Sequence, residues 1–144
     1  MEQKDKTQSR TKKIIGLVAG FGAMILIQQF FFKSPSFDQA MMEAASELNK
    51  SCPIMVDKET RLDNAVALPE NTFQYNYTLV NAEKASVDIE YLTNYLEPAL
   101  INNVKTSPDL KVFRDQKTTM AYYYKDMNGE FITKIEVTAN EYEN

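Results

Sequence analysis

The densest group of reactive side chains lies in the stretch CPIMVDKETRLD, residues 52–63. It contains the only cysteine of the chain, Cys52, together with three acids and one arginine. A nucleophilic cysteine needs a general base, and the chain has no histidine to serve as one. A disulfide within the chain needs a second cysteine. Cys52 is therefore interpreted as a small buried residue in a helix-to-strand connection, with an intermolecular disulfide as the alternative.

Asp57, Glu59 and Asp63 are the candidates for acid–base chemistry, because paired carboxylates can exchange protons with a substrate. In an extended strand these acids and Arg61 occupy alternate positions, which predicts one charged row facing solvent. A hydrolase that uses the acids of residues 57–63 is accordingly the weakest functional hypothesis. We assign no catalytic, cofactor-binding or metal-binding residue, since histidine, the commonest metal ligand, is absent.

Residues 14–32, IIGLVAGFGAMILIQQFFF, form an uncharged run of nineteen residues. At about 1.5 Å per residue, a helix of this length covers a hydrocarbon core of about 30 Å. No small-residue cleavage pattern follows the run, which favours an uncleaved transmembrane helix over a signal peptide. Residues 1–13 carry a net charge of +3 and the remaining chain −7. The positive-inside rule then predicts a cytoplasmic basic tail over 1–13 and an extracytoplasmic domain over 33–144.

Gly16 and Gly20 form a GxxxG motif within the apolar run. Glycines at this spacing let a second helix approach closely in a membrane. Both are candidate contact residues, for a homodimer or for another membrane protein. The acidic charge of the following domain argues against a nucleic-acid partner, since phosphate binding needs clustered Lys and Arg.

The domain is predicted to begin with a helix from Phe37 to about Lys50. Ser36 and Gln39 form a capping box, and apolar residues recur behind them at helical spacing. A hairpin is predicted next, with its turn at residues 69–71. In its first strand Leu62, Val66 and Leu68 share one face. In its second, TFQYNYTLV, the residues Phe73, Tyr75, Tyr77 and Leu79 share one face.

A second helix is predicted after an N-cap at Ser86, with a kink or break at Pro98. Residues 106–109 are predicted as loop. The segment LKVFRDQ, residues 110–116, is counted as an optional strand.

The final hairpin is predicted to close at Asn128-Gly129, a dipeptide typical of two-residue type I′ turns. Met127 then faces Glu130. The resulting register pairs Tyr124 with Thr133, Tyr122 with Ile135, Met120 with Val137, Tyr123 with Lys134 and Ala121 with Glu136. The apolar residues of both strands fall on one face, which leaves Tyr123 as an outward candidate contact residue. The element order α-β-β-α-(β)-β-β predicts an α+β domain, an antiparallel sheet with helices on one face.

Four stretches carry a resemblance: LNKSCPIMVDKETRLD, FQYNYTLVN, INNVKTSPDL and YYYKDMNGEFI. Together they resemble a group of small, functionally uncharacterised bacterial membrane-anchored proteins, over most of residues 46–138. The resemblance implies a bacterial source and, with the predicted anchor, an inner-membrane protein with a periplasmic domain. Proteins of this group often have a cysteine before the position of Pro108. This chain has Val104-Lys105-Thr106 there, so no intrachain disulfide is transferred.

Two functions from different classes remain open on these residues. The leading hypothesis is a non-enzymatic, single-pass membrane-anchored module that binds another protein of the bacterial envelope. The alternative is a binder of a small ligand or cell-wall fragment, which would use the open sheet face around Tyr123.

Overall fold

The computed structural model describes residues 36–144. The predicted basic tail, the transmembrane helix at 14–32 and the GxxxG residues Gly16 and Gly20 lie outside this range. Among residues 36–144, the structure contains no helix with the length and apolar character needed to cross a membrane.

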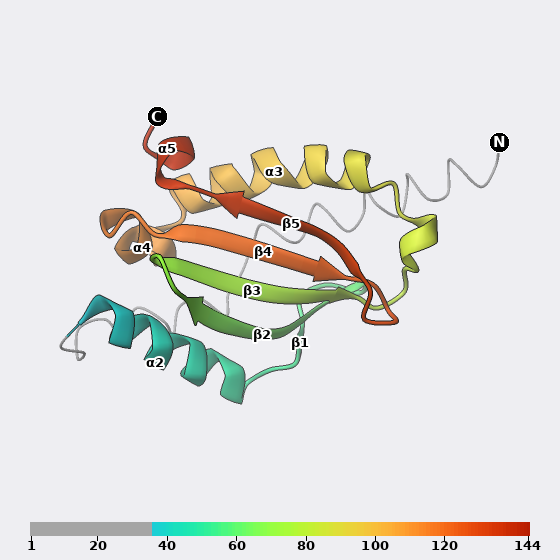
Figure 1. Cartoon of the computed structure of the whole chain (residues 1–144), viewed down its shortest axis with the longest axis horizontal. Helices are drawn as coiled ribbons and strands as arrows, with labels where there is room; N and C mark the ends of the chain where they lie inside the picture. Colours follow the sequence, from blue (N-terminus) through green and yellow to red (C-terminus); the bar gives the residue numbers. More distant parts are fainter. Residues whose placement is uncertain (1–35) are drawn as a thin grey trace.

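The described residues form an α+β domain with one five-stranded sheet (Figure 1). The helices are α2 (Phe37–Lys50), α3 (Ile89–Thr106), α4 (Lys111–Asp115) and α5 (Ala139–Tyr142), with 3-10 turns η2 (Lys84–Ser86) and η3 (Pro108–Leu110). The strands are β1 (Ile54–Met55), β2 (Thr60–Leu68), β3 (Thr72–Leu79), β4 (Thr119–Lys125) and β5 (Phe131–Val137).

The sheet is mixed, and the prediction of a wholly antiparallel sheet is wrong. The strands follow the order β1-β2-β3-β4-β5, and β3 pairs with β4 in parallel while the other neighbours pair antiparallel. The reason is α3, whose 18 residues connect β3 to β4. A helix of this length returns the chain to the end of the sheet at which β3 began. Strand β4 therefore runs in the same direction as β3. The short edge strand β1 was not predicted.

The helices cover one face of the sheet and share one hydrophobic core with it. Helix α2 packs along β2, and α3 packs on the same face along β5, at the opposite end of the strand order (Figure 1). Phe113 of α4 fills the space at one end, with its ring 5.1 Å from Phe73 and 6.4 Å from Phe37. The predicted inward face of the second strand is confirmed, since Phe73, Tyr75, Tyr77 and Leu79 are all buried.

A β-bulge in β2 makes the predicted inward face of that strand partly wrong. Leu62 pairs with Tyr77, but Asn64 pairs with Asn76, so Asp63 is an extra residue. The bulge reverses the alternation after it. Leu62 and Ala65 are therefore buried in the core, whereas Val66 and Leu68 alternate toward the opposite face.

The segment 110–116 is not a strand. Leu110 ends η3, and α4 follows directly, with Leu110 and Phe113 both buried at helical spacing. Helix α3 also continues through Pro98 without a break. Pro98 is exposed, so the backbone groups that it leaves unpaired face water rather than the core.

Two predicted turn details are corrected. The N-cap of α3 is Asp88, whose carboxylate accepts the Tyr91 N–H at 3.0 Å, and Ser86 belongs to η2. The β4–β5 connection is not a type I′ turn, because only Gly129 of its two central residues has positive φ, at 83°. The Asp126 carbonyl accepts from the Gly129 N–H. Met127 does not face Glu130 as predicted, because the Asp126 N–H donates to the Glu130 carbonyl at 2.8 Å and Lys125 pairs with Phe131. A bulge between Phe131 and Thr133 restores the predicted register. The five predicted pairings of the consecutive residues Met120 to Tyr124 with β5 are all confirmed.

The last helix, α5, was not predicted, although its signal is present in the sequence. Thr138 and Glu141 form a capping box at its start. The buried Tyr142 hydroxyl donates to the Thr118 carbonyl at 2.8 Å, which fastens the C-terminus to the start of β4.

Candidate interaction surface

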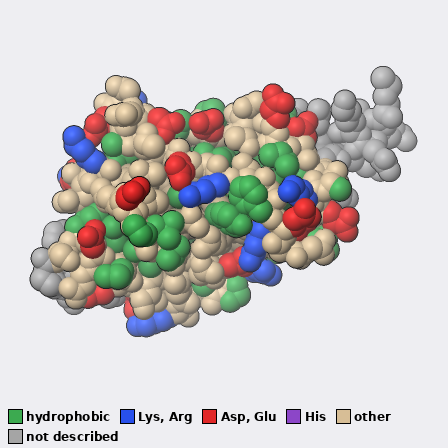
Figure 2. All heavy atoms as spheres, in the orientation of Figure 1, with side chains coloured by type: hydrophobic (Ala, Val, Ile, Leu, Met, Phe, Trp, Pro, Cys, Tyr) green, Lys and Arg blue, Asp and Glu red, His purple; other side chains and the backbone are tan. Residues whose placement is uncertain are grey.

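The face of the sheet opposite the helices is open and carries most of the polar side chains of the strands. Figure 2 shows hydrophobic side chains in separate groups on this face, with charged and polar atoms between them. By strand alternation the face contains Arg61, Asp63, Asn64, Val66, Leu68, Gln74, Asn76, Thr78, Tyr123, Lys125, Lys134 and Glu136.

Three amide side chains form a hydrogen-bonded row across β2 and β3. Asn76 Nδ2 donates to Asn64 Oδ1 at 2.6 Å, and Gln74 Nε2 donates to Asn76 Oδ1 at 2.8 Å. These bonds fix the orientation of each amide. They also keep the centre of the open face polar.

Asp63 is the centre of a charged cluster at the β2 bulge. Its carboxylate lies 2.6 Å from Arg61 Nε and 3.5 Å from Lys125 Nζ, and it accepts the Thr78 hydroxyl at 2.5 Å. Partial burial pulls the pKa of Asp63 upward, but the bonds from Thr78 and Arg61 and the charges of Arg61 and Lys125 outweigh it. The net pKa lies below its ordinary value, so the group is a fixed anion rather than a proton donor.

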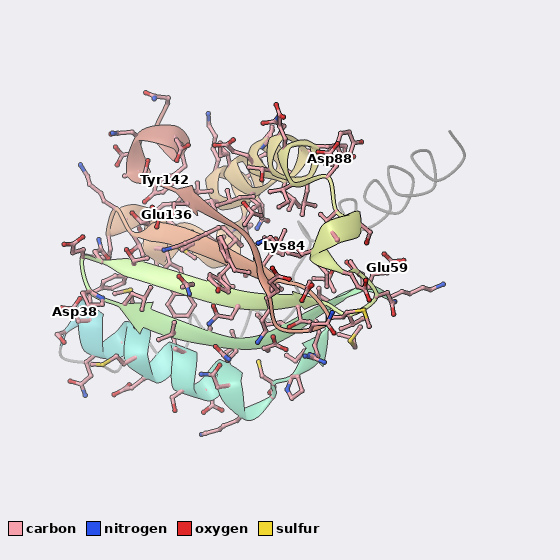
Figure 3. The ribbon with its side chains drawn as sticks, turned by 45° about the vertical axis from the view of Figure 1, so that its right-hand side comes forward. Asp38, Glu59, Lys84, Asp88, Glu136 and Tyr142 are labelled. Carbon is pink, nitrogen blue, oxygen red and sulfur yellow. The ribbon has the colours of Figure 1, made fainter. Side chains whose placement is uncertain are left out.

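The predicted row of acids at 57–63 is not brought together. Only Arg61 and Asp63 lie on one strand face, because β2 begins at Thr60. Asp57 Oδ1 instead accepts the N–H groups of Glu59 and Thr60 at 2.7 and 2.8 Å, which closes the loop before β2. Glu59 lies in that loop, at the end of the sheet near η2 (Figure 3). The three carboxylates therefore do not form the single charged row on one strand face that the sequence predicted.

An aromatic pair stands on the open face beside the charged cluster. Tyr123, the predicted outward residue, packs on Phe131 with ring centroids 5.0 Å apart. Among the phenylalanines of residues 36–144, Phe131 alone is exposed, at 44%. Lys134 and Glu136 form an ion pair at 2.9 Å along β5. Sequence reasoning missed Phe131, because the bulge after it removes it from the alternation.

Cys52 lies in the connection between α2 and β1, and its peptide bond to Pro53 is cis. The side chain is half-buried. Burial, and then the negative charge of Asp63, raise the pKa of the Cys52 thiol. The thiol is therefore protonated and weakly nucleophilic at neutral pH. An intermolecular disulfide through Cys52 remains a prediction.

A groove of about 540 Å³ lies between the first turns of α2 and the end of β2. Its lining consists of Asp38, Met41, Met42, Ala67, Leu68, Pro69, Glu70 and Asn71. In Figure 3 the start of α2, marked by Asp38, lies beside the β2–β3 turn. None of the lining residues is aromatic. Within residues 36–144, no group of three His, Cys, Asp or Glu side chains is arranged to hold a metal ion.

The family described as Domain of unknown function (DUF8479) matches residues 36–132, more than half of the chain. The chain belongs to this family. The matched DUF8479 region runs from the α2 cap to the start of β5. It therefore includes Tyr123 and Phe131 and every residue of the groove. No curated protein matches the sequence.

Three solved structures share the fold of this DUF8479 protein. A Pseudomonas aeruginosa protein assigned as secreted superposes with a TM-score of 0.62 at 8% identity, covering 75% of this chain and 98% of that one. The pilotin EpsS of the Vibrio vulnificus type 2 secretion system gives 0.57 at 13% identity, covering 74% and 92%. The type II secretion system pilotin AspS of Vibrio cholerae gives 0.54 at 12% identity, covering 72% and 90%. At these identities the likeness establishes a common fold.

Proposed function

We propose that this protein is a non-enzymatic module of the bacterial envelope that binds another envelope protein through the open face of its sheet. The observation that carries the proposal is the pair formed by the half-buried Tyr123 and the exposed Phe131, whose ring centroids lie 5.0 Å apart among the polar and charged side chains of the open face. Aromatic side chains contribute much of the binding energy at protein interfaces, particularly when polar and charged residues surround them.

The surroundings of the pair fit this role. The amide row of Asn64, Gln74 and Asn76 and the cluster around Asp63 are already hydrogen-bonded, so the face needs no rearrangement before a partner binds. A pre-ordered surface loses little conformational entropy on association. The fold is also that of two pilotins of type 2 secretion systems.

We further propose that residues 14–32 anchor the protein in the inner membrane, with residues 1–13 in the cytoplasm and the domain in the periplasm. The +3 charge of the tail and the uncharged run support this orientation. Gly16 and Gly20 would contact a second membrane helix, in a homodimer or in the partner. A reporter enzyme fused after Asn144 tests the orientation, since activity on the cytoplasmic side would contradict it.

Site-specific cross-linking in living cells tests the binding function. A photoreactive amino acid placed at Phe131 is expected to give a discrete cross-linked product with one envelope protein. The matched control is Tyr95 on α3, an aromatic residue that is equally exposed. Its ring also packs against another aromatic ring, with the centroids of Tyr95 and Tyr91 6.1 Å apart. The same product from position 95 and none from position 131 would place the interface on the helical side and overturn the proposal.

A further inference from the structure

The outer edge of β2 is a second surface, separate from the Tyr123–Phe131 pair. Strand β1 pairs with β2 only at Arg61 and Leu62. Beyond that point no other strand of residues 36–144 covers the outer edge of β2. An uncovered strand edge presents N–H and C=O groups that can pair with another chain.

At one position of this edge, a side-chain amide of the protein itself makes the hydrogen bonds that the backbone of a neighbouring strand would make. Asn49 of α2 donates from Nδ2 to the Ala65 carbonyl at 2.8 Å and accepts the Ala65 N–H on Oδ1 at 2.7 Å. A side-chain amide making both bonds copies the pairing of a neighbouring strand. The N–H and C=O of Ala65 therefore point outward, away from β3.

Ala67 is the next position with the same direction. Backbone groups alternate along an antiparallel strand, so the N–H and C=O of Ala67 point outward as those of Ala65 do. Ala67 also lines the groove of about 540 Å³ beside α2. No side chain or strand of the described domain pairs with these two groups, so the groove contains one donor and one acceptor placed as in a sheet.

The walls of the groove add apolar surface and negative charge. Met42 is 57% exposed, and its flexible side chain adapts to different apolar partners. Asp38 and Glu70 are the charged residues of the lining, and neither forms an ion pair within residues 36–144. A bound segment is therefore favoured when it carries a positive charge.

We propose that this groove binds an extended segment of a partner protein, which pairs with Ala67 as an added strand. An apolar side chain of the segment packs on Met42 and Leu68, and a lysine or arginine beside it lies between Asp38 and Glu70. Main-chain pairing supplies part of the affinity, and the alternate side chains supply the specificity. Binding in the groove does not depend on the Tyr123–Phe131 pair, because neither residue lines the groove.

The test uses the full chain in detergent micelles and a defined set of blocked heptapeptides of alternating valine and threonine. One peptide carries a lysine at a threonine position, and a second carries glutamate there. Two further lysine peptides are N-methylated, one on the odd-numbered residues and the other on the even-numbered residues. These are the two N-methylated phases, and each lacks the N–H donors of one strand edge. Binding is measured by fluorescence anisotropy.

The lysine peptide is expected to bind at least tenfold more tightly than the glutamate peptide. One N-methylated phase should lose binding while the other keeps it, because an added strand uses only one of its edges. Ala67→Pro should also abolish binding, since it removes the outward donor without removing a bond to β3. The double variant Asp38→Asn/Glu70→Gln should remove the preference for lysine.

Tyr123→Ala is the matched control and should leave peptide binding unchanged. No binding by any peptide, equal binding of both N-methylated phases, or equal affinity of the lysine and glutamate peptides would overturn the inference. The N-methylated pair keeps the test decisive even where Ala67→Pro fails to fold. Because the control variant changes only the open face, failure here is distinguishable from failure of the proposed function.

Discussion

The two faces of the sheet use the same residue type for different purposes. Strand β4 contains three consecutive tyrosines, of which Tyr122 and Tyr124 face the core and Tyr123 faces out. The inner pair stacks on β3, Tyr122 on Tyr75 at 5.6 Å and Tyr124 on Tyr77 at 5.1 Å. Tyr123 packs against the exposed Phe131 instead, with the two rings tilted by 40°. Burial, rather than residue type, separates the two core tyrosines from Tyr123 on the open face.

The inner tyrosines behave as apolar side chains. The hydroxyls of Tyr122 and Tyr124 are buried, and neither finds a hydrogen-bond partner in the described part of the chain. Burial raises the pKa of both phenols well above the ordinary value, so they stay neutral at any physiological pH. The core face thus depends on ring packing, whereas the open face depends on hydrogen bonds and charge.

The largest expected effect separates the two faces by stability. Tyr122→Ala should lower the free energy of unfolding by about 3–5 kcal/mol, because it leaves a cavity beside Tyr75. Tyr123→Ala should lower it by less than about 1 kcal/mol, as expected for a partly exposed residue. Thermal and denaturant unfolding of the two variants measures the difference. Equal losses would mean that the outer face is covered in the native protein.

The edge of β2 provides the next comparison. Asn49→Ala leaves the buried Ala65 without its two partners and should cost about 1–3 kcal/mol. The exposed Asn64, also on an amide network, serves as the control, and its alanine variant should cost less. Hydrogen exchange at the Ala65 amide should accelerate only in Asn49→Ala. Unchanged exchange there would show that the edge is protected by another group.

The β4–β5 turn tests whether backbone conformation supports the register of both faces. Gly129→Ala places a side chain at φ 83°, where it meets no atom within 4 Å. Only backbone strain remains, which should cost about 1–2 kcal/mol. Asn128→Ala, at the neighbouring position without positive φ, is the control and should be nearly neutral. A stability loss in the control equal to that of Gly129→Ala would contradict the turn described here.

The buried hydroxyl of Tyr124 tests whether the core face depends on ring packing alone. Tyr124→Phe keeps the stacked ring and deletes the buried oxygen that has no protein partner. We expect stability to be unchanged or raised, within about 1 kcal/mol. A clear destabilisation in the same unfolding assay would show that the hydroxyl is hydrogen-bonded in solution.

The smallest effect concerns charge on the open face. The folded pKa of Asp63 lies below its unfolded value, so its contribution to stability is complete above the unfolded pKa. That contribution is lost as the pH falls through the folded pKa. Asp63→Asn should therefore flatten the decline in melting temperature below about pH 4. An unaltered pH profile would mean that the bonds to Arg61 and Thr78 do not persist in solution.

Alternation and spacing were sufficient to predict the core face, and they failed where the backbone departs from regular geometry. The register from Met120 to Tyr124 followed from apolar residues sharing one face. The inward face of β2 could not be predicted past Asp63. The bulge there reverses which side chains point inward, and no residue type in the sequence marks it. The parallel pairing of β3 and β4 depends on where α3 packs, which is a tertiary contact.

The candidate site was predictable only in part, for a related reason. Tyr123 could be placed outward because its neighbours fit the core. Phe131 follows a bulged turn, and the groove joins α2 to β2, two elements whose contact has no sequence signature. Surfaces built from several elements become visible only when the elements are packed together.

The central claim is that the open face binds a partner while the core face holds the fold. The measurement that tests it most directly is recovery of the cross-linked envelope complex from cells expressing the double variant Tyr123→Ala/Phe131→Ala. We expect the complex to be lost while the melting temperature of the purified protein changes by no more than a few degrees. Undiminished recovery of the complex from a stably folded double variant would contradict the account.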